Sequence, residues 1–447
     1  MSHCSSLLTL IVAMVLTVMP ARAHDPGIRG VVNSESGEPI PAATVYIWTA
    51  GVKTGYSTYC PSCYRDCGRS ELTDAEGTFE IVDVDPDLLF RLLVVADGYV
   101  PTFVERVDPL KPDRVKAVLK ARQVVEPDSK RVLRGIVLDA EGKPLEGAAV
   151  TPSSVWWVGQ DGRPTGRGGA VEGLDPIAVT NARGEFLLAH KDDTTTWDVT
   201  IEARSHAKQY VKELTSGAAR HTIRLARGGT ITGMLVRNGE PVSNAEVGIS
   251  HTNRFAGHYL GHHVIGTRED GRFEFVNLQS GTDWYVYAKM DAVKHLGATA
   301  TRSVRVGDES SIVDIGKLEI GSAHQLSGRV VLSDGEPVPE GTQVVLSLED
   351  AWDSQIATTG PAGAFSFTGL PRANICISAA VKGYRHSRSN PHLSWSIEGL
   401  IDRDIDKFVI LLDPGVEDFA GLSGGRFRDQ PIQSVTWPPP VAKPHGK

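Results

Sequence analysis

Apolar and polar residues alternate along short stretches of this chain instead of recurring at helical spacing. Residues 245–249 read AEVGI, and residues 273–275 read FEF. When apolar residues recur at every second position, their side chains lie on the same buried face of a strand. Each stretch therefore predicts a β-strand. Sequences such as Asp74–Gly77 and Asp270-Gly271 separate these stretches. Because Gly supplies the positive φ that a tight turn needs, the pattern predicts strands joined in hairpins.

One strand-and-turn block occurs four times. It begins with an apolar residue before x-Gly-x-apolar, and continues with Gly-x-Pro, an Ala-x-Val type strand and a Gly-x-Phe turn. The first glycines are Gly30, Gly135, Gly233 and Gly328, which lie 105, 98 and 95 residues apart. A block of this length is long enough to enclose its own apolar core. About seven short strands in each block predict an all-β chain of four tandem two-sheet sandwiches, arranged as independent beads.

The predicted domains are separated by short polar linkers. They span residues 24–122, 131–226, 229–321 and 325–413, and a Pro- and Gly-rich tail that we expect to be extended covers residues 414–447. The composition agrees with this organisation, since 46 Gly and 26 Pro accompany only 5 Met and 12 Phe. Such a mixture favours turns and disfavours long helices.

The N-terminal residues predict export. An apolar run, Leu7–Met19, precedes Pro20-Ala21-Arg22-Ala23, which is typical of a secretory signal cut after Ala23. An uncleaved anchor is the alternative. No later stretch approaches the roughly 18 apolar residues of a membrane-spanning helix, so we expect the mature chain not to span a membrane. The periplasm, the cell surface and the medium all remain open.

The net charge of −8 is distributed along the chain without a basic stripe. Nucleic acid is therefore not an expected partner, because its binding needs concentrated Lys and Arg.

The repeated block resembles the carboxypeptidase regulatory-like domain, in an exported bacterial type of tandem array. The resemblance covers about residues 27–413. It implies a seven-stranded, transthyretin-like sandwich, related in shape to immunoglobulin-like and carbohydrate-binding-like folds. In carboxypeptidases this domain accompanies a zinc peptidase domain, but no His-x-x-Glu motif occurs in this sequence.

The first block carries a cysteine cluster, Cys60, Cys63 and Cys67, in a long insertion. In an exported protein the cluster favours one local disulfide and one remaining thiol. The alternatives are a zinc site, which lacks an evident fourth ligand, and three thiols that stay unpaired or bond another chain. Iron–sulfur binding and thioredoxin-like exchange are disfavoured. Cys376 alternates with Ile375 and Ile377 and is expected to lie in a core.

Histidines form a second candidate site. His251, His258, His262 and His263 cluster in the insertion of the third block and could bind zinc or copper. The simpler interpretation is a polar exposed loop. After cleavage His24 would become N-terminal, where its amine and imidazole could chelate copper, although a frayed terminus is the simpler interpretation.

Two aromatic features are further candidates. Trp156 and Trp157 could stack on sugar rings, or they could cap the end of the second sandwich. The sequence around Gly55-Tyr56 resembles intradiol dioxygenases, in which this Tyr binds iron. No His lies between Thr73 and Gln123 to complete such a site, so the resemblance implies a shared fold.

The sequence thus predicts a non-catalytic binding or structural array without a cofactor. Recognition of a glycan, a peptide or an envelope protein would use loops held out from the sandwiches, at residues 48–72, 151–179, 250–268 and 348–360. The alternative is a metal-dependent enzyme or metal-binding protein that uses Cys60, Cys63 and Cys67, or His258, His262 and His263. An accessory subunit that tethers another protein is a third hypothesis.

Overall fold

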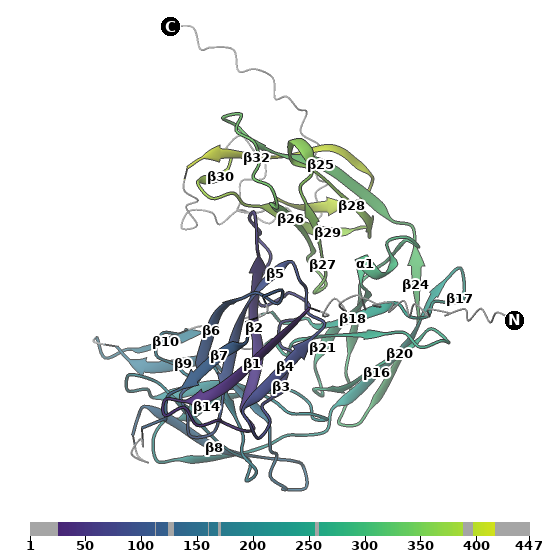
Figure 1. Cartoon of the computed structure of the whole chain (residues 1–447). Helices are drawn as coiled ribbons and strands as arrows, with labels where there is room; N and C mark the ends of the chain where they lie inside the picture. Colours follow the sequence, from purple (N-terminus) through teal and green to yellow (C-terminus); the bar gives the residue numbers. More distant parts are fainter. Residues whose placement is uncertain are drawn as a thin grey trace, which may run out of the picture.

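The computed structural model describes residues 26–111, 113–123, 129–159, 161–168, 171–254, 259–387 and 397–415 (Figure 1). Strands make up nearly all of its regular structure. The helical segments of the described chain are the four-residue α1 (Met290–Val293) and the 3-10 turn η1 (Pro361–Gly363). The all-β class predicted from the alternating pattern is confirmed.

The strands form eight sheets, which occur in four consecutive pairs that we call units one to four. Unit one contains β1 (Gly27–Ser34), β2 (Thr44–Val52), β3 (Ser70–Leu72), β4 (Thr78–Val82), β5 (Leu88–Val95), β6 (Thr102–Val107) and β7 (Val115–Leu119). Its sheets have the strand orders β4-β1-β7 and β3-β2-β5-β6. The other three units repeat this seven-strand plan and add short strands.

Unit two contains β8 (Val132–Leu138), β9 (Ala149–Val158), β10 (Pro164–Gly168), β11 (Ala178–Val179), β12 (Glu185–Ala189), β13 (Thr196–Glu202), β14 (Gln209–Thr215) and β15 (Arg220–Arg224). Unit three contains β16 (Gly229–Arg237), β17 (Glu240–Pro241), β18 (Glu246–His251), β19 (His262–Gly266), β20 (Arg272–Leu278), β21 (Asp283–Ala288), β22 (Ala298–Thr299), β23 (Arg302–Arg305) and β24 (Ile312–Gly321). Unit four contains β25 (His324–Leu332), β26 (Gln343–Leu348), β27 (Ser354–Thr358), β28 (Ala364–Leu370), β29 (Ala373–Ala379), β30 (Tyr384–His386), β31 (Ile397–Ile401) and β32 (Ile405–Pro414). In every unit the first strand pairs in parallel with the last.

The recurring Gly and Phe of the block are cross-strand partners. The registered pairs are Gly30 with Phe79, Gly135 with Phe186, Gly233 with Phe273 and Gly328 with Phe365. A Cβ atom on Gly30 would lie 2.5 Å from the ring of Phe79. Units one to three therefore need Gly at this position, because the aromatic ring lies directly over the backbone of the neighbouring strand, and in unit four the backbone of Phe408 excludes a Cβ atom on Gly328.

Each pair of sheets encloses a hydrophobic core of its own. Trp197 and Trp284 are buried in these cores. Cys376 differs from the prediction, since it is half-buried while Ile375 and Ile377 of the same strand face the core. Neighbouring residues of a strand point to opposite faces, and the two isoleucines take the inner one.

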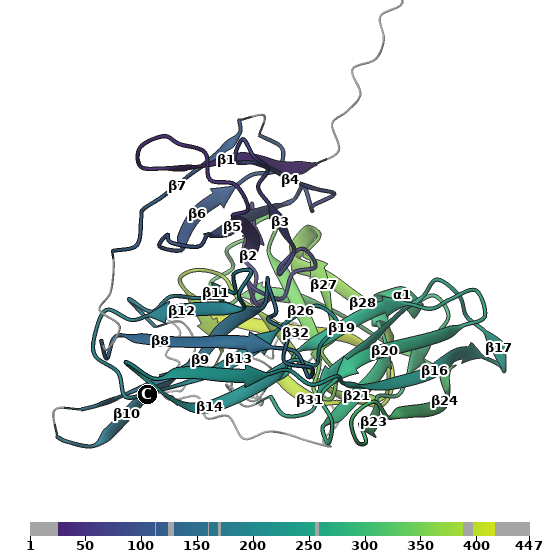
Figure 2. The same cartoon turned by 90° about the horizontal axis from the view of Figure 1, so that it is seen from below.

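The four units are not independent of one another, because each packs against its neighbours. Apolar side chains of units one and two share a small cluster, and Tyr210 of unit two packs against the core of unit three. Tyr287 and Met290 of unit three belong to the core cluster of unit four. Tyr56 of unit one packs against that same cluster. The four units therefore form a closed ring, and Figures 1 and 2 show unit four returning to lie beside unit one.

Candidate functional site

A cavity of about 580 Å³ lies between units one and two. Residues of β2 and of the loop before β3 line one side, and residues of β9, β13 and the following turn line the other. The lining side chains that carry rings, hydroxyls or charges are Tyr46, Trp48, Ser62, Ser70, Thr151, Thr200, Glu202, Arg204 and Lys208. A volume of this size is within the range of small-molecule sites, about 300–1,000 Å³.

Apolar side chains hold the two sides of the cavity together. Leu93 and Val95 of β5 pack with Ile177 of unit two, and the half-buried Trp48 packs beside them. No feature of the sequence indicated this role for the outer face of the sheet that contains β2 and β5. An ion pair of 2.9 Å between Arg122 and Asp175 adds to the contact. Burial raises the pKa of Asp175, and the charge of Arg122 opposes that rise.

The polar rim of the cavity comes mainly from unit two. Lys208 lies 3.2 Å from Glu202 and neutralises much of its charge. The guanidinium of Arg204 makes no hydrogen bond or ion pair within the described part of the chain, so it is available to a ligand. Burial raises the pKa of Tyr46, and the charge of Glu202 raises it further. The phenol therefore stays neutral and can donate a hydrogen bond.

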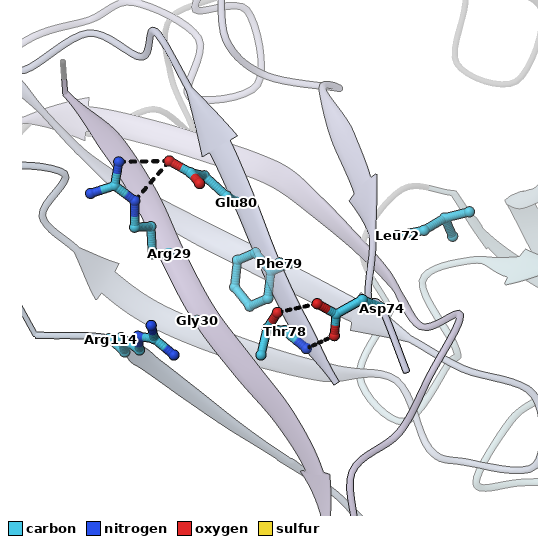
Figure 3. Close-up of a pocket in the computed structure, with 8 residues that line it drawn as sticks. All are labelled: Arg29, Gly30, Leu72, Asp74, Thr78, Phe79, Glu80 and Arg114. Carbon is cyan, nitrogen blue, oxygen red and sulfur yellow. Dashed lines mark hydrogen bonds and ion pairs between the residues drawn. The ribbon is translucent and has the colours of Figure 1, made fainter. Parts of the chain in front are cut away.

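A second hollow of about 330 Å³ lies on the outer face of unit one (Figure 3). Three of its four charged side chains already bond to neighbours, and the fourth is Arg114. Arg29 binds Glu80 through Nε at 2.7 Å and Nη2 at 2.6 Å, and Asp74 accepts hydrogen bonds from the backbone and hydroxyl of Thr78. The hydrogen bond from the Thr78 hydroxyl is the main reason that the pKa of Asp74 is lowered. This arrangement leaves few polar groups for a ligand.

Three of the four predicted loops pack against other units instead of extending outward. The insertion of unit one docks on unit four, where the carbonyl of Tyr56 accepts a 2.7 Å hydrogen bond from the Gln343 backbone. The hydroxyls of Thr58 and Ser378 lie 2.7 Å apart. Gly55 approaches unit four so closely that a Cβ atom on it would lie 2.1 Å from the backbone of Gly341. Packing against unit four is thus the role of Gly55-Tyr56 in the structure.

The insertion of unit four contacts unit three through a buried acid. The Asp353 side chain is 1% exposed, forms an ion pair with Lys289 and accepts a 2.7 Å hydrogen bond from the backbone N–H of Met290. Burial raises the pKa of Asp353, and Lys289 opposes the rise. Next to it, the backbone N–H of Trp352 donates to the Tyr287 hydroxyl at 3.2 Å.

Aromatic rings complete the junction of units three and four. The ring of Trp352 stacks on Tyr259 at a centroid distance of 4.9 Å and on His262 at 5.4 Å. The guanidinium of Arg254 lies 5.3 Å from the centre of the Trp352 ring. Contacts of this kind add directional stabilisation to the apolar burial.

The predicted histidine site is not assembled in the described residues. His251 is buried beside Trp284, and its Nδ1 lies 3.1 Å from the carbonyl of Asn253. His262 and His263 are adjacent in β19, so one faces Trp352 and the other faces Trp284. His258 and His24 lie outside the described residues. Zinc or copper binding stays a prediction.

Cys60, Cys63 and Cys67 come together in the turns between β2 and β3, and all three are thiols in this structure. The expected local disulfide is not formed here. Throughout the described ranges, no three His, Cys, Asp or Glu side chains are placed to share a metal ion. The metal-dependent alternative is therefore supported by no arrangement of the described residues.

Trp156 and Trp157 point to opposite faces of β9. Trp157 packs against the core of unit two, as expected for a residue that caps the sandwich. Trp156 is 39% exposed, and it lies over Gly166 of the paired strand β10. The two rings do not form one platform, and a stacking role for Trp156 stays a prediction.

His262 makes the junction of units three and four sensitive to acid. Desolvation beside neighbouring rings is the main cause that lowers its pKa from 6.5 to about 4, and the charges of His263, Lys289 and Lys208 contribute to the same shift, although part of the residue stays exposed. The neutral imidazole is therefore the form that the fold favours. We expect its stabilising effect to be complete above pH 6.5 and to be lost as the pH falls toward 4.

Urea unfolding at pH 7.5 and pH 5 tests this expectation. His262→Gln should reduce the loss of stability on acidification, because this imidazole stacks on Trp352, and His295→Gln, outside that stack, should not. Equal pH dependence in the wild type and both variants would contradict it.

No feature of the sequence identified Lys289 and Asp353 as residues that join units three and four. No local pattern marks this ion pair, because each residue finds its partner in another unit.

No family model matches the chain, and no curated protein is similar to it. Among solved structures, the Bacillus anthracis TIE protein shares 12% identity over 83% of this chain and 68% of its own, with a TM-score of 0.18. A Streptococcal ancillary pilin shares 15% over 66% of this chain and 99% of its own, with a TM-score of 0.24. BcpA, the major pilin subunit of Bacillus cereus, shares 11% over 66% and 99%, with a TM-score of 0.17. Similarity at this level assigns neither a family nor an activity.

Within the described ranges, none of the helices has the length and apolar character that crossing a membrane would require.

Proposed function

We propose that this chain is an exported, non-catalytic binding scaffold of four carboxypeptidase regulatory-like domains, corresponding to units one to four. Its ligand is a short glycan held in the cavity between units one and two. The observation that carries the proposal is the composition of that cavity, in which Tyr46 and Trp48 of unit one face hydroxyls and charges of unit two.

The lining favours a sugar over a purely apolar ligand. Aromatic surface suits the C–H faces of a sugar ring, while Thr151 and Ser70 offer hydroxyls that donate and accept hydrogen bonds. Arg204 adds a cation that is not engaged within the described residues. A carboxylate on the sugar would pair with this guanidinium, so we favour an acidic oligosaccharide.

The two sides of the cavity are held in fixed positions, which supports a binding role. Its two sides belong to sandwiches that are joined by buried apolar contacts and by the pair Arg122–Asp175. A site between such elements needs little ordering when a ligand enters, which reduces the entropic cost of binding.

Calorimetric titration with neutral and uronate-containing di- to tetrasaccharides tests the proposal. We expect the wild type to prefer the acidic series and Arg204→Ala to weaken that binding about tenfold or more, since a hydrogen bond to a charged group contributes about 1.5–3 kcal/mol. Arg163→Ala, at a side chain 85% exposed in the hairpin of unit two, is the control and should bind as the wild type does. If no sugar binds at millimolar concentration, or if both variants behave alike, the proposed function is wrong.

A further inference from the structure

The loop between β2 and β3 holds two thiols at the ends of one tight turn. The backbone N–H of Cys63 donates to the carbonyl of Cys60 at 2.9 Å. The end residues of such a four-residue turn have Cα atoms less than about 7 Å apart, which is close to the span of a disulfide. The two thiols are also close enough for each to be the main influence on the pKa of the other. The backbone thus already brings this pair together.

The third thiol of the loop is engaged elsewhere. Cys67 Sγ donates to the carbonyl of Pro61 at 3.3 Å, and the side chain packs against the core of unit one. A bond from Cys67 to either other cysteine would require it to leave both contacts. The arrangement therefore favours Cys60 and Cys63 as partners over any pair that includes Cys67.

The two ends of the turn differ in reactivity. Cys60 is exposed, and its Sγ lies 3.3 Å from the Ser62 hydroxyl. The hydrogen bond from the Cys63 thiol, supported by Ser62, lowers the pKa of Cys60 to about 5. Burial instead raises the pKa of Cys67 to about 12. The thiolate is the nucleophilic form, so Cys60 is the residue that reacts first at neutral pH.

We propose that Cys60 and Cys63 form a reversible thiol–disulfide site that reacts with external disulfides once the chain is exported. The Cys60 thiolate attacks one sulfur of the external disulfide, forming a mixed disulfide and releasing one thiolate. Cys63 then loses its proton to water and attacks the Cys60 sulfur, which releases the second thiolate. The protein dithiol is oxidised to a disulfide, and the external disulfide is reduced to two thiols.

This site controls the loop that clamps unit one to unit four. The hydroxyl of Tyr59 donates to the carbonyl of Cys63 at 2.9 Å, and its ring packs edge-on against Tyr64 at 4.8 Å. The same loop presents Thr58 to Ser378. Closing the turn with a covalent bond restricts the loop in the unfolded chain and so favours the docked conformation. The inference does not depend on the proposed ligand.

Peptide mapping of the full-length chain tests the pairing. Trypsin cuts after Lys53, Arg65 and Arg69, so residues 54–65 carry Cys60 and Cys63 while residues 66–69 carry Cys67. After incubation with oxidised glutathione, peptide 54–65 should be lighter by two hydrogens and resist alkylation, and Cys67 should still be alkylated. A link between peptides 54–65 and 66–69, or full alkylation of all three cysteines, would overturn the proposal.

Matched serine variants define the roles of the cysteines. Cys67→Ser should oxidise as the wild type does, whereas Cys63→Ser should stop at a mixed disulfide of Cys60 with glutathione. In the reduced wild type, alkylation at pH 6 should modify Cys60 at least about tenfold faster than Cys67. Equal rates would contradict the assignment of Cys60 as the attacking thiol, even where a variant fails to fold.

Discussion

Replacing Asp353 by Ala is expected to lower the free energy of unfolding at the junction of units three and four by about 3–5 kcal/mol. This is the cost of removing one partner of a buried ion pair while the other charge stays buried. Asp353 is 1% exposed, and it pairs with Lys289 and the backbone N–H of Met290. Its removal would leave the ammonium of Lys289 facing an apolar region without its partner. Urea denaturation followed by tryptophan fluorescence measures the effect, because Trp352 lies beside the lost carboxylate in sequence.

An exposed pair supplies the control for that measurement. Arg268 and Glu274 lie 2.9 Å apart, with side chains 65% and 42% exposed, and Glu274→Ala should change stability by no more than about 1 kcal/mol. The double variant Lys289→Met/Asp353→Leu should recover much of the loss, since it removes both charges together. If Asp353→Ala and Glu274→Ala have the same effect, the buried pair does not stabilise the junction.

The second large effect is expected in the core of unit three. Phe273 is 2% exposed and packs over Gly233 of the neighbouring strand. Phe273→Ala should cost about 3–5 kcal/mol, through lost burial and the cavity that remains. Val276 lies in the same strand β20 and is 52% exposed, so Val276→Ala should stay within about 0.5 kcal/mol.

Hydrogen exchange shows how far the Phe273→Ala effect spreads. Tyr287 and Met290 of unit three are part of the core cluster of unit four, so amides of β28 and β32 should lose protection together with those of unit three. If hydrogen exchange stays unchanged throughout unit four, the units unfold separately. That result would contradict the energetic coupling expected from a closed ring of units.

Local features of the sequence were enough to predict the class of the fold. Alternation at positions such as 245–249 depends only on the two-residue period of a strand, and Asp270-Gly271 needs only the conformational freedom of Gly. The repeat also contains Gly30 and Phe79 at recurring positions. Their direct contact became visible only in the register of β1 with β4. The domain boundaries and the carboxypeptidase regulatory-like assignment stay predictions.

The candidate site was predicted less well. The sequence marked the Cys60, Cys63 and Cys67 loop, but it did not show that this loop would dock against unit four or line the cavity beside unit two. Extended recognition loops were expected, and three of these instead pack against other units. Trp48 of β2 lies where units one and two meet, in contact with residues that no local pattern connects to it.

The sequence by itself determined the strands, the turns and four separate apolar interiors, because each depends on residues close together in the chain. Only the tertiary structure decided the closed ring, the cavity between units one and two, and the burial of Asp353 beside Lys289. These features join residues that are far apart in sequence, such as Thr58 and Ser378. Their pairing is set by the complementary shapes of whole folded units, and no short pattern of residues records such a shape.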